Sequence, residues 1–335
     1  MKTKVSKKLI CILLLFSSFS TFVFAAKQKT DIPILYLFTK GNSKNHAYLI
    51  YKGEELITDL SCLKERNILE IRLDRNNKDS LLFSEKSETL YRVARLNFVT
   101  NEETVLFEFE FEAEMEKYIN YRAFTETSFF YCNTRENNSK LHNLYEYNST
   151  TKEITKLFVV DPGYIKNVQA DGNYIYFYVD GSFDGPSGYY VIDRATGEVH
   201  ENEINLGWTS AGGRYNNKLI REGSKVERYG NMEYWARDEK SCVILDMVTF
   251  KETKCTFKKR YEAMGGPLIL LSEDYFLVPL CIQPVRDSLR NGLFGCNWTV
   301  CYTVFDINKN KAIFNGIVSE TSEMRIVDAV LLRYN

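Results

Sequence analysis

The stretch from Tyr164 to Ile204 decides the fold and reads YIKNVQADGNYIYFYVDGSFDGPSGYYVIDRATGEVHENEI. It contains four short runs rich in Tyr, Phe, Val and Ile, separated by the polar segments DGN, DGSFDGPSG and RATG. Runs of this composition bounded by Gly, Asp and Asn are typical of β-strands joined by turns. We therefore expect four strands in meander order, which together make one antiparallel sheet.

The third strand of this unit, its turn and its fourth strand recur five more times. The copies are AYLIYKGEELITDL (Ala47–Leu60), LYRVARLNFVTNEETVLFEF (Leu90–Phe109), LYEYNSTTKEITKLFVV (Leu144–Val160), CVILDMVTFKETKCTF (Cys242–Phe257) and CYTVFDINKNKAIFNGIV (Cys301–Val318). The last residues before the turns, Tyr51, Asn97, Asn148, Asp193, Asp246 and Asp306, follow one another at steps of 46, 51, 45, 53 and 60 residues. Steps of about 40 to 50 residues are typical of four-stranded blades. The fold class is therefore an all-β propeller of six blades, with a range of roughly five to seven.

The Asn or Asp before most of these turns has a local cause. Its short side chain accepts main-chain N–H bonds and stabilises a tight reversal. We interpret these positions as turn residues, and as ligand groups only if the fold brings them together.

The two ends of the chain suggest how the ring closes. The runs MRIVD and AVLLRYN, residues 324–335, follow the last copy with no further turn unit. If they pair with the N-terminal strands in one sheet, no strand edge stays open there.

The strand DGNYIYFYV and the segment GYYVIDRATGEV resemble bacterial periplasmic propellers of the Tol-translocation type. In those proteins the third strand often ends in a D-x-x-T/N-G turn, which Asp193-Arg194-Ala195-Thr196-Gly197 matches here. The resemblance covers most of residues 33–335 as a pattern and is sharp in one blade. It implies a rigid ring whose loops bind partners.

The first 25 residues have the three zones of a secretory signal peptide. Four lysines precede an apolar run from Leu9 to Phe24, and Val23 and Ala25 stand at positions −3 and −1. We expect cleavage after Ala25, which leaves residues 26–335 as a single propeller-like domain without a membrane span. The expected location is periplasmic or secreted.

The composition is that of an ordinary globular protein, with 44% hydrophobic and 26% charged residues. The chain carries a formal net charge of −1, and removal of the four signal lysines leaves about five negative charges in excess. Such a balance argues against a nucleic-acid partner.

Export permits disulfides, and seven cysteines remain after cleavage. If Met247 to Phe250 form a hairpin loop, Cys242 stands opposite Cys255, within reach of a bridge. Cys281 with Cys296 or Cys301 is a second possible pairing between adjacent strands. Buried free thiols remain the alternative for each pair.

No motif commits the chain to a catalytic mechanism. The three histidines are widely separated, and neither HExxH nor G-x-S-x-G occurs. Asp180, Ser182 and Asp184 match the opening of a calcium loop, but Val191 occupies the position of the closing acid. We expect no cofactor, with calcium at this loop as the weaker alternative to a plain hairpin loop.

Aromatic and arginine side chains gather in the two longest and least regular insertions, Gly223–Lys240 and Gln283–Asn297, or beside them. They are Trp208, Arg228, Tyr229, Tyr234, Trp235, Arg237, Arg286, Arg290, Phe294 and Trp298. Loops on a rigid scaffold carry many binding sites, and Trp, Tyr and Arg dominate interface hot spots. The alternative is that the rings cap the blade cores.

These observations predict a non-enzymatic binding or scaffold protein of the bacterial envelope, with a protein or glycan of the cell envelope as its partner. The second hypothesis is a carbohydrate-active enzyme or sugar-binding protein. It would use aromatics and carboxylates of the central channel, with Asp171 and Asp328 among the candidates near strand ends.

Overall fold

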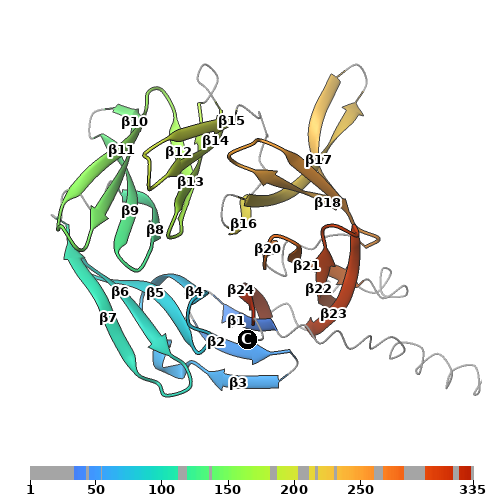
Figure 1. Ribbon diagram of the computed structural model, residues 1–335, viewed down its shortest axis with the longest axis horizontal. Helices are drawn as coiled ribbons and strands as arrows, with labels where there is room; N and C mark the ends of the chain where they lie inside the picture. The colour runs from blue at the N-terminus through green and yellow to red at the C-terminus, as the bar shows by residue number, and fades with distance from the viewer. Residues whose placement is uncertain are drawn as a thin grey trace, which may run out of the picture.

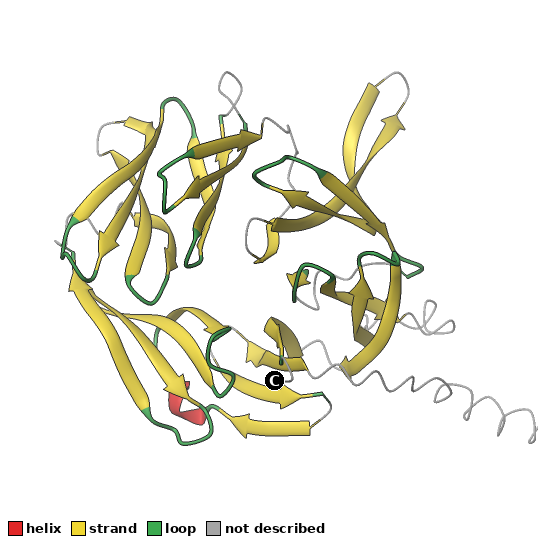
Figure 2. Cartoon of the chain, in the orientation of Figure 1, coloured by secondary structure: helices red, strands yellow, loops and turns green. Residues whose placement is uncertain are grey.

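The computed structural model describes residues 34–42, 45–53, 55–111, 119–135, 138–181, 187–202, 211–215, 218–229, 232–259, 267–282, 299–319 and 324–332. Within these ranges the chain is almost entirely β-structure, with one short 3-10 helix, η1 (Ser61–Leu63), as Figure 2 shows. No helix in the described ranges is long and apolar enough to cross a membrane.

Six four-stranded antiparallel sheets stand around a ring as blades (Figure 1). Blade 1 holds β24 (Met324–Leu331), β1 (Ile34–Asn42), β2 (Asn45–Lys52) and β3 (Glu55–Asp59), and blade 2 holds β4 (Ile68–Leu73), β5 (Ser80–Ser87), β6 (Leu90–Asn97) and β7 (Glu103–Glu110). Blade 3 holds β8 (Ile119–Phe124), β9 (Ser128–Arg135), β10 (Asn138–Asn148) and β11 (Ile154–Val160), and blade 4 holds β12 (Tyr164–Ala170), β13 (Tyr174–Asp180), β14 (Gly188–Asp193) and β15 (Val199–Asn202). Blade 5 holds β16 (Ala211–Tyr215), β17 (Lys218–Tyr229), β18 (Met232–Asp246) and β19 (Glu252–Thr256), and blade 6 holds β20 (Ile269–Leu270), β21 (Tyr275–Ile282), β22 (Thr299–Asp306) and β23 (Lys311–Ser319).

The predicted all-β propeller of six blades is therefore confirmed. The four expected strands of the unit at residues 164–204 are β12 to β15, and each of the other five copies falls on the third and fourth strands of its own blade.

The core lies between the blades. Middle strands such as β14 are buried along nearly their whole length, because a neighbouring blade covers each face of the sheet. Outer strands such as β3 are mostly exposed. Each of six hydrophobic clusters among the described residues joins one pair of adjacent blades. Aromatic and β-branched side chains thus supply the contacts between sheets.

The ring closes through the C-terminal strand, as expected. β24 pairs with β1 along almost its full length, with Ile326 opposite Phe38. The two runs MRIVD and AVLLRYN contribute to one strand. The register shifts between Leu37, opposite Asp328, and Phe38, opposite Ile326, so Val327 has no counterpart on β1, as in a β-bulge. Blade 1 is therefore built from both ends of the described chain.

The insertion Gly223–Lys240, expected to be irregular, instead belongs to a regular hairpin. β17 and β18 have 12 and 15 residues and pair with each other from Lys218–Asp246 out to Tyr229–Met232. The outer part of this hairpin projects from blade 5 at the upper right of Figure 1. The arm, as we call the paired segments 223–229 and 232–238, is thus a β-ribbon and not a loop.

Candidate functional site

A cavity of about 1490 Å³ lies inside the ring, and each of the six innermost strands contributes to its lining. Every innermost strand has one edge that no strand of its own blade covers, so its carbonyl groups on that edge face the middle of the ring. Ligand pockets commonly enclose roughly 300 to 1,000 Å³. The cavity is large enough for a ligand.

Two arginines of blade 2 reach these free carbonyls. The guanidinium of Arg72, on β4, donates to the carbonyl oxygens of Phe124 (2.7 Å) and Ala170 (3.1 Å), on blades 3 and 4. Arg75 donates to the carbonyl oxygen of Leu270 on blade 6 at 3.1 Å. Two side chains of blade 2 therefore connect that blade to blades 3, 4 and 6 across the ring.

Both guanidinium groups also lie over aromatic rings. Arg72 lies 4.4 Å from the ring centroid of Phe124, and Arg75 lies 5.2 Å from that of Tyr215 on blade 5. Such contacts stabilise a cation in a partly desolvated site. A third arginine, Arg122 on β8, lines the same cavity and lies 5.5 Å from the ring centroid of Tyr91.

Asp328, on the closing strand β24, lies at the same cavity. Its carboxylate accepts main-chain hydrogen bonds from Leu73 (2.9 Å) and Ala329 (2.8 Å), and the first of these joins blade 1 to blade 2. Burial raises the pKa of Asp328, although both N–H groups and the positive charges of Arg75 and Arg72 act in the opposite direction. The carboxyl group is therefore easier to protonate than an exposed aspartate.

The rim of the cavity is formed by the turns that join the first two strands of several blades. In blade 2, Asp74 accepts the N–H groups of Asn76 (2.8 Å) and Asn77 (3.2 Å). Asp171 in blade 4 does the same with Asn173 and Tyr174. These acids act as turn caps, which is the local role expected for Asp at such positions.

The Asn and Asp residues that precede the turns between third and fourth strands were predicted to stabilise those turns, and this prediction is also confirmed. In each of these hairpins the side-chain oxygen accepts a main-chain N–H two or three residues further on. The residues are Asn97, Asn148, Asp193, Asp246 and Asp306.

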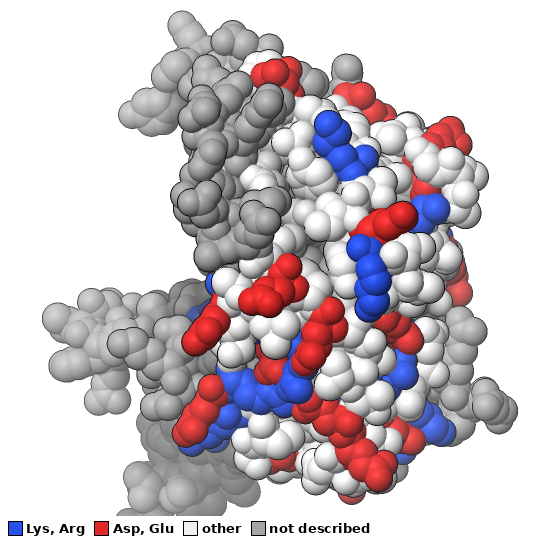
Figure 3. Space-filling view, turned by 90° about the vertical axis from the view of Figure 1, so that its left-hand side faces the viewer, with Lys and Arg blue, Asp and Glu red and all other residues white. Residues whose placement is uncertain are grey.

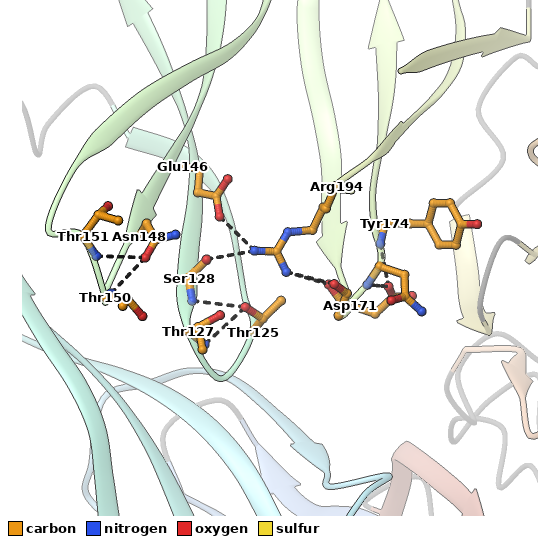
Figure 4. Close-up of polar contacts among 12 residues, drawn as sticks. Thr125, Thr127, Ser128, Glu146, Asn148, Thr150, Thr151, Asp171, Tyr174 and Arg194 are labelled. Carbon is orange, nitrogen blue, oxygen red and sulfur yellow. Dashed lines mark hydrogen bonds and ion pairs between the residues drawn. The ribbon is translucent and has the colours of Figure 1, made fainter. Parts of the chain in front are cut away.

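Arginines at the rim connect adjacent blades. Figure 4 shows Arg194 of blade 4 reaching Ser128 (3.0 Å) and Glu146 (2.9 Å) of blade 3, while its other nitrogen donates to the carbonyl oxygens of Asp171 and Gly172. The motif residue Arg194, which follows Asp193 in the sequence match to Tol-type propellers, thus has a structural role.

Arg95 of blade 2 makes the equivalent connection. It contacts Asp74 at 2.9 Å in its own blade and Glu126 at 2.7 Å in blade 3. Charge-assisted contacts of this kind fix geometry as well as adding energy. The rim is therefore held in place by paired charges.

The structure places the predicted binding residues in two groups. Arg228, Tyr229, Tyr234, Trp235 and Arg237 all belong to the arm, where Trp235 stands opposite Val226 and Tyr234 opposite Glu227. Trp208, Arg286, Arg290, Phe294 and Trp298 lie outside the described residues. The outer part of the β17–β18 hairpin points away from the middle of the ring (Figure 1).

The predicted cysteine register is confirmed for one pair. Cys242 stands directly opposite Cys255, and both are buried free thiols in the structure. Burial raises the pKa of Cys242 well above its usual value. Cys281 stands opposite Val300 and Cys301 opposite Leu280, whereas Cys296 lies outside the described residues.

The proposed calcium loop is only partly visible. Asp180 is described, and its carboxylate accepts a hydrogen bond from the Lys166 ammonium at 2.6 Å. Ser182 and Asp184 lie outside the described residues. Elsewhere in the described ranges, no group of three or more His, Cys, Asp or Glu side chains is placed to hold a metal.

The sequence reasoning did not find Arg72, Arg75 or Arg122. A signal for Arg72 was present in residues 70–74, where Glu, Arg and Asp alternate with Ile and Leu along a strand; Arg75 directly follows Asp74 and Arg122 lies elsewhere, so neither shares that signal. Such alternation marks a strand with one polar face. In β4 this alternation places Glu70 and Arg72 on the side opposite Ile71 and Leu73, and from that side Arg72 reaches the carbonyl oxygens of Phe124 and Ala170.

Charges on the outside of the ring are mixed. On the side that Figure 3 shows, acidic and basic side chains of the described residues are interspersed. A nucleic-acid surface would gather Lys and Arg on one face. This side of the molecule does not have that distribution among its described residues.

Comparisons with known proteins support the propeller class alone. No protein-family model matches the chain, and no curated protein matches its sequence. Among solved structures, TolB from Acinetobacter baumannii is similar, with a TM-score of 0.52, 12% identity, and coverage of 95% of this chain and 70% of that one. Oligogalacturonate lyase from Vibrio parahaemolyticus is also similar, with a TM-score of 0.47, 10% identity, and coverage of 85% of this chain and 82% of that one. The resemblance to Tol-type propellers is thus confirmed at the level of fold.

Proposed function

We propose that this protein is an exported, non-enzymatic binding or scaffold protein of the bacterial envelope, and that the arm of blade 5 is its contact with a macromolecular partner, a protein or a glycan. The proposal combines the signal-like N-terminus with a rigid propeller scaffold. The arm is the observation that carries it.

Among the described strands of blade 5, only β17 and β18 extend into the arm. β16 pairs with β17 only as far as Arg221, and β19 pairs with β18 only as far as Ser241. Between Gly223 and Asp238 the described strands form a ribbon of two strands with two open edges. A two-stranded ribbon is marginally stable alone in water. A ribbon that gains a partner would be stabilised by it.

The base of the arm is shaped by a bulge. The register moves from Glu222–Cys242 to Gly223–Asp238, so three residues of β18 have no counterpart on β17. Glycine suits position 223 because a Cβ there would collide with the Ser241 hydroxyl and lie 2.9 Å from the Ser241 carbonyl oxygen. The Asp238 carboxylate accepts from that hydroxyl (2.5 Å) and from the main chain of Lys240 (3.1 Å). Bulges of this kind change the direction of a ribbon.

The test removes the arm and keeps the blade. Residues 224–237 are replaced by Asn-Gly, which joins the register partners Gly223 and Asp238 by a tight turn. We expect the shortened protein to melt within about 2 °C of the full chain, because the described pairing of β16 with β17 and of β19 with β18 ends before the arm. We also expect it to lose partners that the full chain recovers from envelope extract.

Equal recovery of every partner by both proteins would refute the arm as the binding site. The exported state has its own measurement. Intact-mass analysis of protein secreted by a bacterial host should show a mature chain beginning at Ala26, and an unprocessed chain would contradict the signal-peptide prediction.

A further inference from the structure

The arm of blade 5 has one regular edge, which belongs to β17. Along residues 223–229 this strand pairs with β18 on one side, and on its other side the described part of β16 pairs with it only as far as Arg221. The three unmatched residues of the bulge, 239–241, all belong to β18, so they interrupt the edge of β18 at the base of the arm and leave β17 continuous. Because a bulge redirects or ends pairing, β17 offers the better edge for a further strand.

The sequence of this edge, GSKVERY, matches itself in the antiparallel direction. If two copies of the chain pair about a twofold axis at Val226, Lys225 of each copy stands opposite Glu227 of the other. Opposite charges that face each other across two strands stabilise the pairing. The same register sets Gly223 opposite Tyr229, and an aromatic residue opposite glycine stabilises a sheet edge. The seven residues of the edge are therefore complementary along their length.

The neighbouring registers do not have this match. An axis at Lys225 would put two lysines opposite each other, and an axis at Glu227 would do the same with two glutamates. Like charges directly opposite each other are destabilising. Since the side-chain pattern sets the register of paired strands, the charges favour the register centred on Val226.

The second strand of the arm extends the match. Trp235 stands opposite Val226 within the hairpin. Two arms that pair at Val226 would therefore form a sheet of four strands with the row Trp–Val–Val–Trp across its middle. Residues opposite one another share a face of the sheet, and aromatic and β-branched residues are favourable cross-strand neighbours. A sheet of four strands is also stable where a single ribbon is marginal.

We propose that the arm binds a second copy of this chain, by antiparallel pairing of residues 223–229 of β17 about Val226. The dimer is isologous, because both copies contribute the same seven residues, and its main-chain hydrogen bonds are those of strand addition. This inference rests on the proposed role of the arm as a contact surface and adds self-association to that role. Pairing through β17 leaves the edge of β18 for an envelope partner.

The test is analytical ultracentrifugation of the purified exported chain, residues 26–335, over a wide range of concentration. We expect a monomer–dimer equilibrium for the wild type. Lys225→Glu and Glu227→Lys each turn both opposite-charge pairs of the dimer into like-charge pairs, so each should weaken self-association on the order of tenfold. An equimolar mixture of the two variants has opposite charges at both positions again and should associate about as tightly as the wild type.

Arg237→Glu is the matched control on the other strand. The edge of β18 has an antiparallel match of its own about Trp235, with Glu233 of one copy opposite Arg237 of the other. The change would disrupt pairing through β18 and should leave pairing through β17 intact. Loss of the dimer in Arg237→Glu but not in the two β17 variants would overturn the assignment to β17.

A wild type that stays monomeric at every concentration would overturn the proposal. A mixture of Lys225→Glu and Glu227→Lys that associates no better than either variant alone would overturn the register. Recovery of envelope partners separates these results from the proposed function. A monomer that needs its arm to recover a partner would refute self-association alone, whereas a dimer whose full and shortened chains recover the same partners would refute only the proposed partner site.

Discussion

Replacing Ile326 by alanine tests whether the closing strand holds the ring together. Ile326 is 2% exposed and packs in the cluster between blades 1 and 6 with Phe38, Leu277 and Tyr302. Truncation of a buried isoleucine removes its transfer free energy and leaves a cavity, at a cost of about 2 to 5 kcal/mol. Neighbouring blades are rigid sheets that cannot collapse far into the gap, so we expect a value in the upper half of that range.

The assay is thermal unfolding followed by circular dichroism or calorimetry. One kcal/mol lowers Tm by about 2 to 4 °C in a domain of 150 to 250 residues, and slightly less in a larger one. Ile326→Ala should therefore melt about 5 to 15 °C below the wild type. Arg325→Ala, at the exposed neighbouring position, should change stability by no more than about 0.5 kcal/mol.

A deletion gives the stronger form of the same test. Removal of residues 324–335 takes away all of β24, including the buried side chains of Ile326, Ala329 and Val330, and leaves one edge of β1 open. Burial of the Ile and Val alone contributes about 3 to 6 kcal/mol, against a total stability of about 5 to 15 kcal/mol for a typical domain. The reasoning is refuted if the shortened chain melts within a degree or two of the wild type.

Three further predictions concern buried titratable groups. His142 is 3% exposed, and its Nδ1 accepts the N–H of Ile165 at 3.3 Å. Burial lowers the pKa of His142, and the positive charge of Lys166 lowers it further. The contribution of the neutral imidazole to stability should therefore be present above about pH 6.5 and lost as pH falls. His142→Leu should accordingly be less stable than the wild type at pH 8, with a gap in Tm that narrows toward pH 5; a constant gap would contradict this. Because the pKa of Asp328 is raised in the folded protein, its stabilising contribution is present at low pH and is lost as pH rises through the folded-state pKa. The Tm of Asp328→Asn minus the Tm of the wild type should therefore increase with pH. A difference that decreases with pH would contradict this. Finally, oxidative export should join Cys242 to Cys255, which peptide mass mapping without reductant would detect; Cys242→Ser would then cost up to about 3 kcal/mol, and two unmodified thiols in the exported protein would rule the bridge out.

Much of the fold followed from local chemistry. The alternation in residues 164–204 predicts four strands because strand pairing and turn formation depend on neighbours in the sequence, and the Asp193 carboxylate indeed caps its own turn. The opposition of Cys242 and Cys255 followed from counting outward from a four-residue loop, since one loop length fixes the register of the whole hairpin.

The arm shows where this reasoning fell short. The segment from Gly223 to Lys240 does not resemble the other blades, and we expected an irregular insertion. In the structure the two middle strands of blade 5 simply continue, displaced by a bulge at Gly223 that depends on its close approach to Ser241. A long ribbon of mixed polar and aromatic residues carries no strong period, so the sequence gives little sign of it.

The sequence by itself determined that this is an all-β repeat protein of six units with a closing C-terminal segment, because each unit is specified by residues close together along the chain. Only the tertiary structure decided the central site. Arg72 bonds to a carbonyl 98 residues away, and Arg75 to one 195 residues away. Those carbonyls are available because each innermost strand has a free edge, and they come within reach only when the ring has closed.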